Sequence, residues 1–247
     1  MKKHIPNMIT CCNLISGCIA TYFAFQGNYP AALVAIIAGA VFDFFDGMTA
    51  RLLGVSSPIG KELDSLADVI TFGFAPSAML FSFLNEQCSM FNVQCSMVNG
   101  QWSMFNGQCS MFNVQWIAFL MAAFSALRLA KFNLDERQAM GFIGLPTPAN
   151  ALFWASLIVG GGEWLAGSPY YIYGVVAMML LSCWLLIAEV PMFALKFKTW
   201  DWHSNEVKYV FLIIALAIIV SIHSTVSIAV VIAWYVLLSL ITNRKKC

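Results

Sequence analysis

Long runs of apolar residues with almost no charge dominate this chain. Only 10% of its 247 residues are charged, against about 25% in a soluble globular domain. A helix that crosses a bilayer needs about 20 mainly apolar residues. The candidate runs, some of them shorter than this, are roughly 6–26, 31–53, 60–84, 116–133, 148–165, 170–190, 208–222 and 224–242. The sequence therefore predicts an all-α integral membrane protein with about eight transmembrane helices.

The basic residues are sorted according to the side of the membrane that each connection faces. With eight spans and a cytoplasmic N-terminus, the outward connections are 27–30, 85–115, about 160–169 and the link at His223, and none contains Lys or Arg. All thirteen Lys and Arg residues fall on the other side or at its boundary. This is the distribution of the positive-inside rule. It predicts two cytoplasmic termini in the cell membrane, and core helices of a soluble protein would not produce it.

Residues 88–115 form four tandem heptads, CSMFNVQ, CSMVNGQ, WSMFNGQ and CSMFNVQ. A period of seven is typical of coiled coils, but these units lack the flanking charges of a coiled-coil seam and include glycine twice. We interpret 85–115 as an outward-facing loop insert within a single polytopic membrane domain, residues 1–247. An oligomerisation segment is the alternative.

Four aspartates lie where the second predicted span ends and the third begins. Asp43 and Asp46 are spaced i, i+3, and Asp64 and Asp68 are spaced i, i+4, so each pair lies on one face of its helix. A carboxylate inside a membrane helix costs roughly 2.5–3.5 kcal/mol, and basic residues at the boundary offset two charges at most. Carboxylate oxygens select hard cations, so the pattern predicts two divalent ions, Mg²⁺ or Mn²⁺.

Each of these features also has a less specific interpretation. Two aspartates at i, i+3 can form a solvated helix end, glycine often serves helix packing, and Arg51 can be a boundary anchor. Intramembrane acids also line ion pathways, so a cation transporter is an alternative from another class. Against transport, the acids cluster at one membrane face, and no interrupted helices occur in matching halves. No nucleic-acid-binding patch is evident in the sequence.

The joint pattern DxxDGxxARx₈GxxxDxxxD, from Asp43 to Asp68, resembles the signature of the CDP-alcohol phosphatidyltransferase family, and every fixed position is present. The resemblance implies that Asp43 and Asp64 each bridge both metal ions. It implies that Asp46 completes one metal site, and that Asp68 completes the other and acts as the catalytic proton acceptor.

The same stretch predicts a site for CDP-diacylglycerol. Gly47, Gly60 and Ala50 leave room for a nucleotide and its phosphates to approach the backbone, and Arg51 offers a planar fork for phosphate oxygens. The family resemblance adds Ser57 to the contacts with the CDP portion. Near the N-terminus, Asn7 and Thr10 either cap the first helix or approach the nucleotide, as similar positions do in the family.

Further stretches resemble the phosphatidylserine synthase branch of the family: IPNMIT (5–10), 60–77, ALRLAKFN (126–133) and GLPTPANAL (144–152). The resemblance implies transfer of the phosphatidyl group from CDP-diacylglycerol to L-serine by a homodimer in the membrane. A sibling transferase that uses glycerol 3-phosphate or another alcohol is the alternative. Arg128 and Lys131, near the cytoplasmic end of the fourth span, are candidates for binding the acceptor carboxylate, or else are positive-inside anchors.

Overall fold

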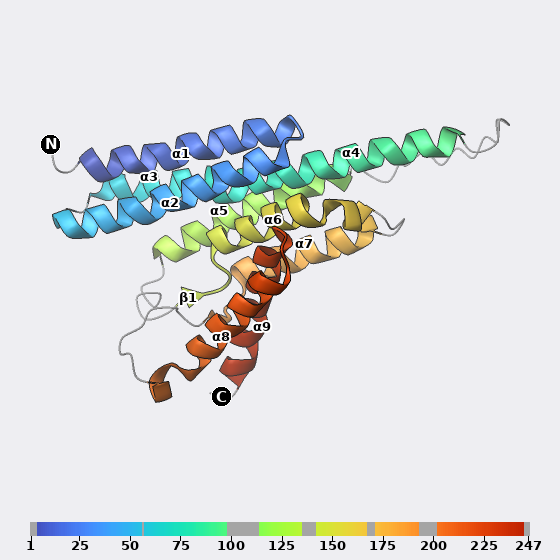
Figure 1. Ribbon diagram of the computed structural model, residues 1–247. Coiled ribbons are helices and arrows are strands. Elements are labelled where there is room, and N and C mark those ends of the chain that lie inside the picture. Colours follow the sequence, from blue (N-terminus) through green and yellow to red (C-terminus); the bar gives the residue numbers. More distant parts are fainter. Residues whose placement is uncertain are drawn as a thin grey trace.

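The computed structural model describes residues 4–55, 57–97, 114–134, 142–166, 171–192 and 202–244, and within these ranges the chain is almost entirely helical (Figure 1). The helices in chain order are α1 (His4–Phe25), α2 (Tyr29–Leu53), α3 (Pro58–Asp68), α4 (Ala75–Met97), α5 (Phe119–Leu134), α6 (Thr147–Ala166), α7 (Tyr171–Ile187), α8 (Trp202–Ser221) and α9 (Val226–Arg244). A π-helix, η1 (Val69–Phe74), joins α3 to α4, and a 3₁₀-helix, η2 (Val114–Ala118), leads into α5. The short strands β1 (Phe142–Ile143) and β2 (Pro191–Met192) pair antiparallel.

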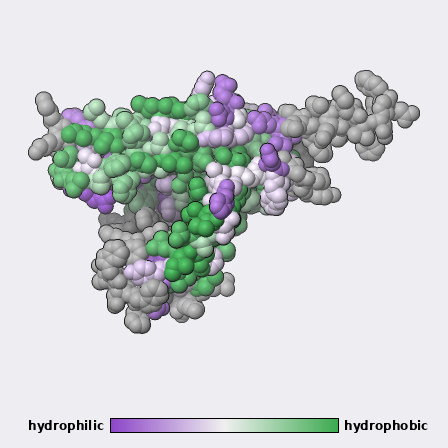
Figure 2. Space-filling view, in the orientation of Figure 1, coloured by the Kyte–Doolittle hydropathy of each residue, from purple (hydrophilic) through white to green (hydrophobic). Residues whose placement is uncertain are grey.

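Several of these helical segments have the length and composition of membrane spans. Four are long and apolar enough to cross a bilayer: His4–Phe25, Tyr29–Leu53, Pro58–Gln87 and Val114–Leu134. Tyr171–Ile187 and Val226–Thr242 are shorter apolar helices. Apolar residues cover most of the visible flank of the bundle, and hydrophilic residues gather toward its ends (Figure 2). The predicted all-helical fold is confirmed for the described residues, and its long apolar helices are consistent with an integral membrane protein. Eight spans and two cytoplasmic termini stay predictions.

Each predicted span corresponds to a helix, although some boundaries differ from the prediction. α4 continues to Met97, so the chain is still helical where the sequence predicted a loop from residue 85. No Gly or Pro interrupts the chain between 85 and 97, and the first glycine of the repeat is Gly100, so no strong helix breaker ends α4 earlier. Residues 98–113 of the insert lie outside the described residues. α8 begins at Trp202 rather than at residue 208.

Small residues allow the N-terminal helices to approach one another closely. A Cβ atom on Gly17 of α1 would lie 2.8 Å from Thr71 Cα in η1, and a Cβ atom on Gly39 of α2 would lie 2.5 Å from Thr71 Cγ2. Thr71 is fully buried, and its Oγ1 donates a hydrogen bond to the Asn13 carbonyl oxygen at 3.0 Å. Close approach through small residues favours helix association in membranes, and here it locks α1, α2 and η1 together.

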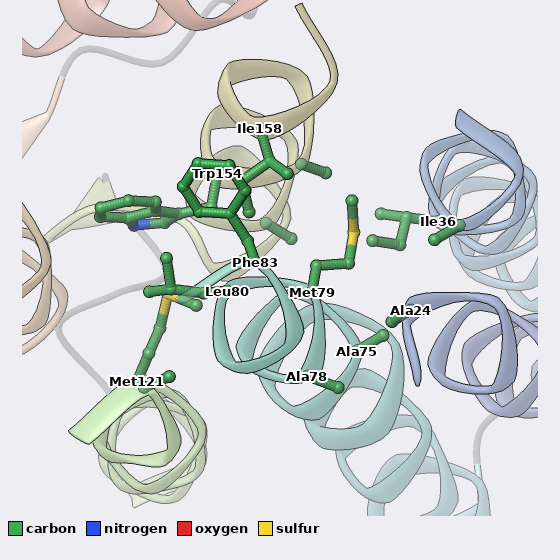
Figure 3. Packing of buried hydrophobic residues seen from close by; sticks show 14 of the residues in the cluster. Ala24, Ile36, Ala75, Ala78, Met79, Leu80, Phe83, Met121, Trp154 and Ile158 are labelled. Atoms are coloured by element: carbon green, nitrogen blue, oxygen red, sulfur yellow. The ribbon is translucent and has the colours of Figure 1, made fainter. Parts of the chain in front are cut away.

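A buried apolar core joins this N-terminal group to the later helices (Figure 3). Trp154 of α6 packs with Phe83 and Leu80 of α4, and the cluster reaches Met121 of α5. The indole Nε1 of Trp154 donates to Ser182 Oγ of α7 at 3.1 Å, so its polar edge is satisfied inside the core. The hairpin of α8 and α9 packs on this core through α9, which contacts α6. The core therefore holds α1–α5 in a fixed arrangement around the aspartates.

Candidate metal and nucleotide site

Three of the four aspartates come together near the C-terminal end of α2 and along α3. One carboxylate oxygen each from Asp43, Asp64 and Asp68 lies within 4.8 Å of the other two. Asp68 is only 9% exposed, and Asp64 Oδ1 is buried without a hydrogen-bond partner in the described part of the chain. Carboxylates this close repel one another unless a cation lies between them. An unsatisfied buried oxygen in an all-oxygen donor set therefore fits a divalent metal ion.

Asp46 lies outside this group of three. It is 6% exposed and accepts a hydrogen bond from Thr10 Oγ1 of α1 at 2.6 Å. Together with Asp64 it lines a cavity at the side of the carboxylate group. The predicted set of four aspartates thus divides into a close group of three and a fourth that is held by α1.

α1 contributes a buried polar residue, Asn13, that reasoning from the sequence missed. Asn13 is fully buried, and its Nδ2 donates to Asp68 Oδ1 at 3.2 Å, while its Oδ1 has no hydrogen-bond partner. A signal for this residue exists in the sequence, because Pro6, Thr10, Asn13 and Gly17 are spaced as one side of a helix. All four are buried. Polar side chains on one side of an apolar span indicate a buried polar contact or a functional site.

The π-helix η1 begins immediately after Asp68. A π-helical turn holds more residues than an α-helical turn, so it changes the face that the chain presents between α3 and α4. Asp68 and Thr71, on either side of this junction, both contact Asn13, one through the side-chain amide and one through the carbonyl oxygen. π-helical turns are frequent at functional sites, and the spacing rules of a continuous α-helix do not predict this one.

A cavity of about 330 Å³ lies beside the aspartates, between α1, the end of α2 and the start of α3. It is lined by all but one of the residues that the sequence assigned to CDP-diacylglycerol. These lining residues are Asn7, Thr10, Gly47, Ala50, Ser57 and Gly60. The exception is Arg51, which is exposed and whose Nε donates to the Gly47 carbonyl oxygen at 2.9 Å.

The shape of this cavity depends on residue 60 being glycine, which has no side chain. A Cβ atom there would lie 2.9 Å from Ser57 Oγ and 3.0 Å from Asn7 Oδ1. Ser57 is the N-cap of α3, because its Oγ accepts a hydrogen bond from the Gly60 amide at 3.0 Å. Pro58 follows at the first helical position, which favours a helix start. The same short segment thus begins α3 and shapes the cavity.

The two predicted acceptor-binding cations have different surroundings. Arg128 of α5 is 7% exposed, and its Nε is buried with no hydrogen-bond partner among the described residues. Its guanidinium interacts electrostatically with Asp68 and with Tyr235 of α9, a residue that the sequence did not single out. Lys131 is instead at the surface, where its Nζ forms an ion pair with Glu189 Oε1 at 3.0 Å. Of the two, Arg128 is the cation that interacts with the aspartate group.

Two hydrogen bonds connect the end of α5 to α3. Lys61 Nζ donates to the Asn133 carbonyl oxygen at 3.3 Å, and Asn133 Nδ2 donates to Ser65 Oγ at 2.8 Å. The stretch 126–133, which contains Arg128, and the stretch 60–77, which contains Asp64 and Asp68, therefore meet in space. This contact places Arg128 on the same side of the bundle as the aspartates.

A sequence model described as CDP-alcohol phosphatidyltransferase matches residues 3–242. The chain belongs to the CDP-alcohol phosphatidyltransferase family. The matched range includes all of the aspartates, the cavity, Arg128 and Tyr235. The family resemblance carried by the pattern from Asp43 to Asp68 is confirmed.

Individual members of the family are also similar to this chain. A protein of Bacillus subtilis (strain 168) named CDP-diacylglycerol–serine O-phosphatidyltransferase is 36% identical over 153 residues, which cover 59% of this chain and 70% of that protein. Proteins of the same name from Mycobacterium leprae and Methanocaldococcus jannaschii are each 29% identical, over 76% and 71% of this chain. The aligned part is 57% of the Mycobacterium leprae protein and 68% of the Methanocaldococcus jannaschii protein.

Proposed function

We propose that this protein transfers the phosphatidyl group of CDP-diacylglycerol to L-serine, giving phosphatidylserine and CMP. The observation that carries the proposal is the group of three carboxylates within 4.8 Å of one another, beside a cavity lined by the family signature. The names of the similar proteins support serine as the acceptor. The reaction is an attack of the serine hydroxyl on phosphorus with CMP as the leaving group.

The CDP portion of the lipid occupies the cavity between α1, α2 and α3. Of the lining residues, Gly47 and Gly60 have no side chain and Ala50 has only a methyl group, so phosphate oxygens reach the helix surfaces. Lys61 lines the same cavity, and Arg51, which donates a hydrogen bond to the carbonyl oxygen of the lining residue Gly47, adds a second cation for the pyrophosphate. Asn7 and Ser57 supply polar side chains at the wall near Gly60.

The four aspartates fit two divalent ions, Mg²⁺ or Mn²⁺. Asp43, Asp64 and Asp68 would hold them from the close group, with Asp46 completing the set beside the cavity. All of the donor atoms are carboxylate oxygens, which suits these hard cations. When bound, such ions neutralise the pyrophosphate and stabilise the charge that develops on the leaving phosphate.

Asp68 acts as the general base. One of its oxygens is held by Asn13, which leaves the other oxygen to take the proton of the serine hydroxyl. The serine oxygen forms a bond to the phosphorus that carries diacylglycerol. The bond from this phosphorus to the oxygen of the CMP phosphate breaks, and CMP leaves with the electron pair. Because Asp68 is buried, water has little access to compete with serine for the same phosphorus.

Arg128 binds the carboxylate of serine. Its buried guanidinium interacts with Asp68 and keeps an unsatisfied Nε–H, which suits an anionic group next to the proposed base. Lys131, paired with Glu189, is the second candidate. A variant with Arg128→Met should lose most activity with serine, and Arg128→Lys should recover part of it. An equal loss of binding for acceptors without a carboxylate would contradict this role.

We also propose that the aspartate site and both termini face the cytoplasm across the cell membrane, with eight spans. Arg51, Lys61 and Lys131 support this orientation, because these basic residues lie at the end of the bundle that carries the aspartates. α4 leads away from this end (Figure 1), which supports an outward position for the 85–115 insert in a single domain of residues 1–247. The homodimer rests on the family resemblance and stays a prediction.

The decisive experiment measures CMP release from CDP-diacylglycerol by the purified full chain, with Mg²⁺ or Mn²⁺ and one acceptor at a time. Release with serine alone supports the proposal. Release with glycerol 3-phosphate or another alcohol instead would establish the sibling transferase. Folded protein that releases no CMP with any acceptor would overturn both and favour the cation transporter, an alternative that family membership does not support.

A further inference from the structure

A second cavity lies among α6, α7 and α9 and shares no lining residue with the cavity beside the aspartates. Its volume is about 280 Å³. Apart from one amide and one hydroxyl its wall is formed by apolar side chains, and no charged residue lines it. The residues used below are Asn150 on α6, Leu181 and Ser182 on α7, and Ala233 and Leu237 on α9.

Asn150 is the unusual member of this wall. Its side chain is fully buried, and neither Nδ2 nor Oδ1 has a hydrogen-bond partner among the residues that the structure describes. Ser182 is not a hydrogen-bond partner of Asn150. Its Oγ donates to the Met179 carbonyl oxygen at 2.9 Å and accepts from Trp154 Nε1 at 3.1 Å. A buried amide with both of its polar atoms unsatisfied is costly and rare in a native structure. A ligand that both accepts from and donates to this amide would satisfy it.

The rim of the cavity is apolar and open. Leu181 is 55% exposed and Leu237 is 53% exposed, and both lie on apolar helices. In a membrane these side chains meet lipid hydrocarbon. Water is a poorer match, because a buried water makes about three hydrogen bonds on average, and the free polar atoms of this wall are the two of a single amide. An acyl chain entering from the bilayer matches the rest of the wall.

We propose that this cavity binds a neutral acylglycerol, with an acyl chain along the apolar wall and the glycerol portion at Asn150. An ester carbonyl oxygen accepts from Nδ2, and a neighbouring free hydroxyl donates to Oδ1. The lack of charged lining residues disfavours a phosphate headgroup, because a charge buried without a partner is costly. Diacylglycerol meets these requirements, and phosphatidylcholine, which has no free hydroxyl, does not.

The test is photolabelling of the full chain in nanodiscs with a diacylglycerol that carries a diazirine in one acyl chain. Labelled peptides are mapped by mass spectrometry, and phosphatidylcholine and an alkane with the same diazirine serve as comparison probes. We expect diacylglycerol to label α7 and α9 at the cavity at least tenfold more than phosphatidylcholine. Unlabelled diacylglycerol should reduce this labelling. Labelling that is equal for both lipids, or that resists competition, would overturn the proposal.

Variants identify the cavity as the site of labelling. Ala233→Phe fills the cavity from α9 and should remove labelling by diacylglycerol, whereas Ala217→Phe, at an exposed alanine of α8 outside the cavity, should not. Asn150→Leu should lower labelling by diacylglycerol and leave labelling by the alkane unchanged. Unchanged diacylglycerol labelling in Ala233→Phe or in Asn150→Leu would refute the assignment. The competition measurement uses the native chain and does not depend on how the variants fold.

Discussion

Replacing Asp64 with asparagine should have opposite effects on stability in the absence and in the presence of divalent metal. Without metal, the Asp64 carboxylate is repelled by Asp43 and Asp68, and its Oδ1 has no hydrogen-bond partner. Asparagine keeps the size of the side chain and removes the charge. With metal, the same carboxylate is a ligand, so its loss weakens metal binding. The variant thus separates a metal site from a merely structural group of acids.

The size of the effect follows from the separation of the carboxylates. Two unit charges at 4.8 Å, the largest separation among the three oxygens, repel by about 3.5 kcal/mol at an effective dielectric constant of 20. Asp64 takes part in two of these pairs, so the repulsion at this separation is about 7 kcal/mol. Solvent and proton uptake reduce this repulsion, and we expect a gain of about 1–3 kcal/mol for the metal-free variant. Each kcal/mol shifts the unfolding midpoint by about 2–4 °C in a chain of this length.

The measurement is thermal unfolding of the detergent-purified chain, followed by tryptophan fluorescence with EDTA or with Mn²⁺ and CDP-diacylglycerol. Native protein should gain about 2.7 kcal/mol at a metal concentration a hundred times its Kd, and Asp64→Asn should gain far less. Glu62→Gln, at an exposed position of the same helix, is the matched control and should behave as the native protein does. Destabilisation of Asp64→Asn in EDTA, or equal stabilisation of both proteins by metal, would refute the reasoning.

Three further predictions concern catalysis, packing and the repeat. Asp68→Asn should keep the fold and lower the rate of CMP release by about 10²–10⁴-fold, the contribution of a general base; normal turnover would eliminate Asp68 from this role. Gly17→Ala places a Cβ atom against Thr71 and should lower the free energy of unfolding by about 1–3 kcal/mol. Gly174→Ala, where no atom lies within 4 Å of the new Cβ, should raise it by up to about 1 kcal/mol, and equal effects of the two changes in denaturation would contradict the packing described here. Deleting residues 88–115 should leave CMP release largely intact, and complete loss of activity in folded protein would show that the repeat is needed.

Local spacing in the sequence was enough to locate the elements of the site. Asp43 with Asp46 and Asp64 with Asp68 lie on single helix faces because the α-helical period is a local property of the backbone. The small residues Gly47, Ala50 and Gly60 were recognised in the same way, and they line the cavity beside Asp64. The apolar runs located every helix for a similar reason, because length and hydropathy alone decide what a bilayer accepts.

Other features escaped prediction because they depend on contacts between distant segments. Asn13 lies on a different helix from Asp68, and their hydrogen bond depends on how α1 packs against α3 and η1. The sequence treated Arg128 and Lys131 as equivalent, yet one is buried near Asp68 and the other pairs with Glu189. Tyr235 lies far along the chain on α9, and its electrostatic interaction with Arg128 depends on the tertiary structure.

The sequence by itself determined that this chain is a helical membrane protein with a concentrated acidic site, because charge placement and helical period are short-range properties. Only the tertiary structure decided that three carboxylates form one close group while Asp46 accepts a hydrogen bond from Thr10. It also decided the π-helical turn after Asp68 and the cavity at Asn150. These depend on which helices touch and at what register, and packing between whole helices sets that register rather than any local pattern.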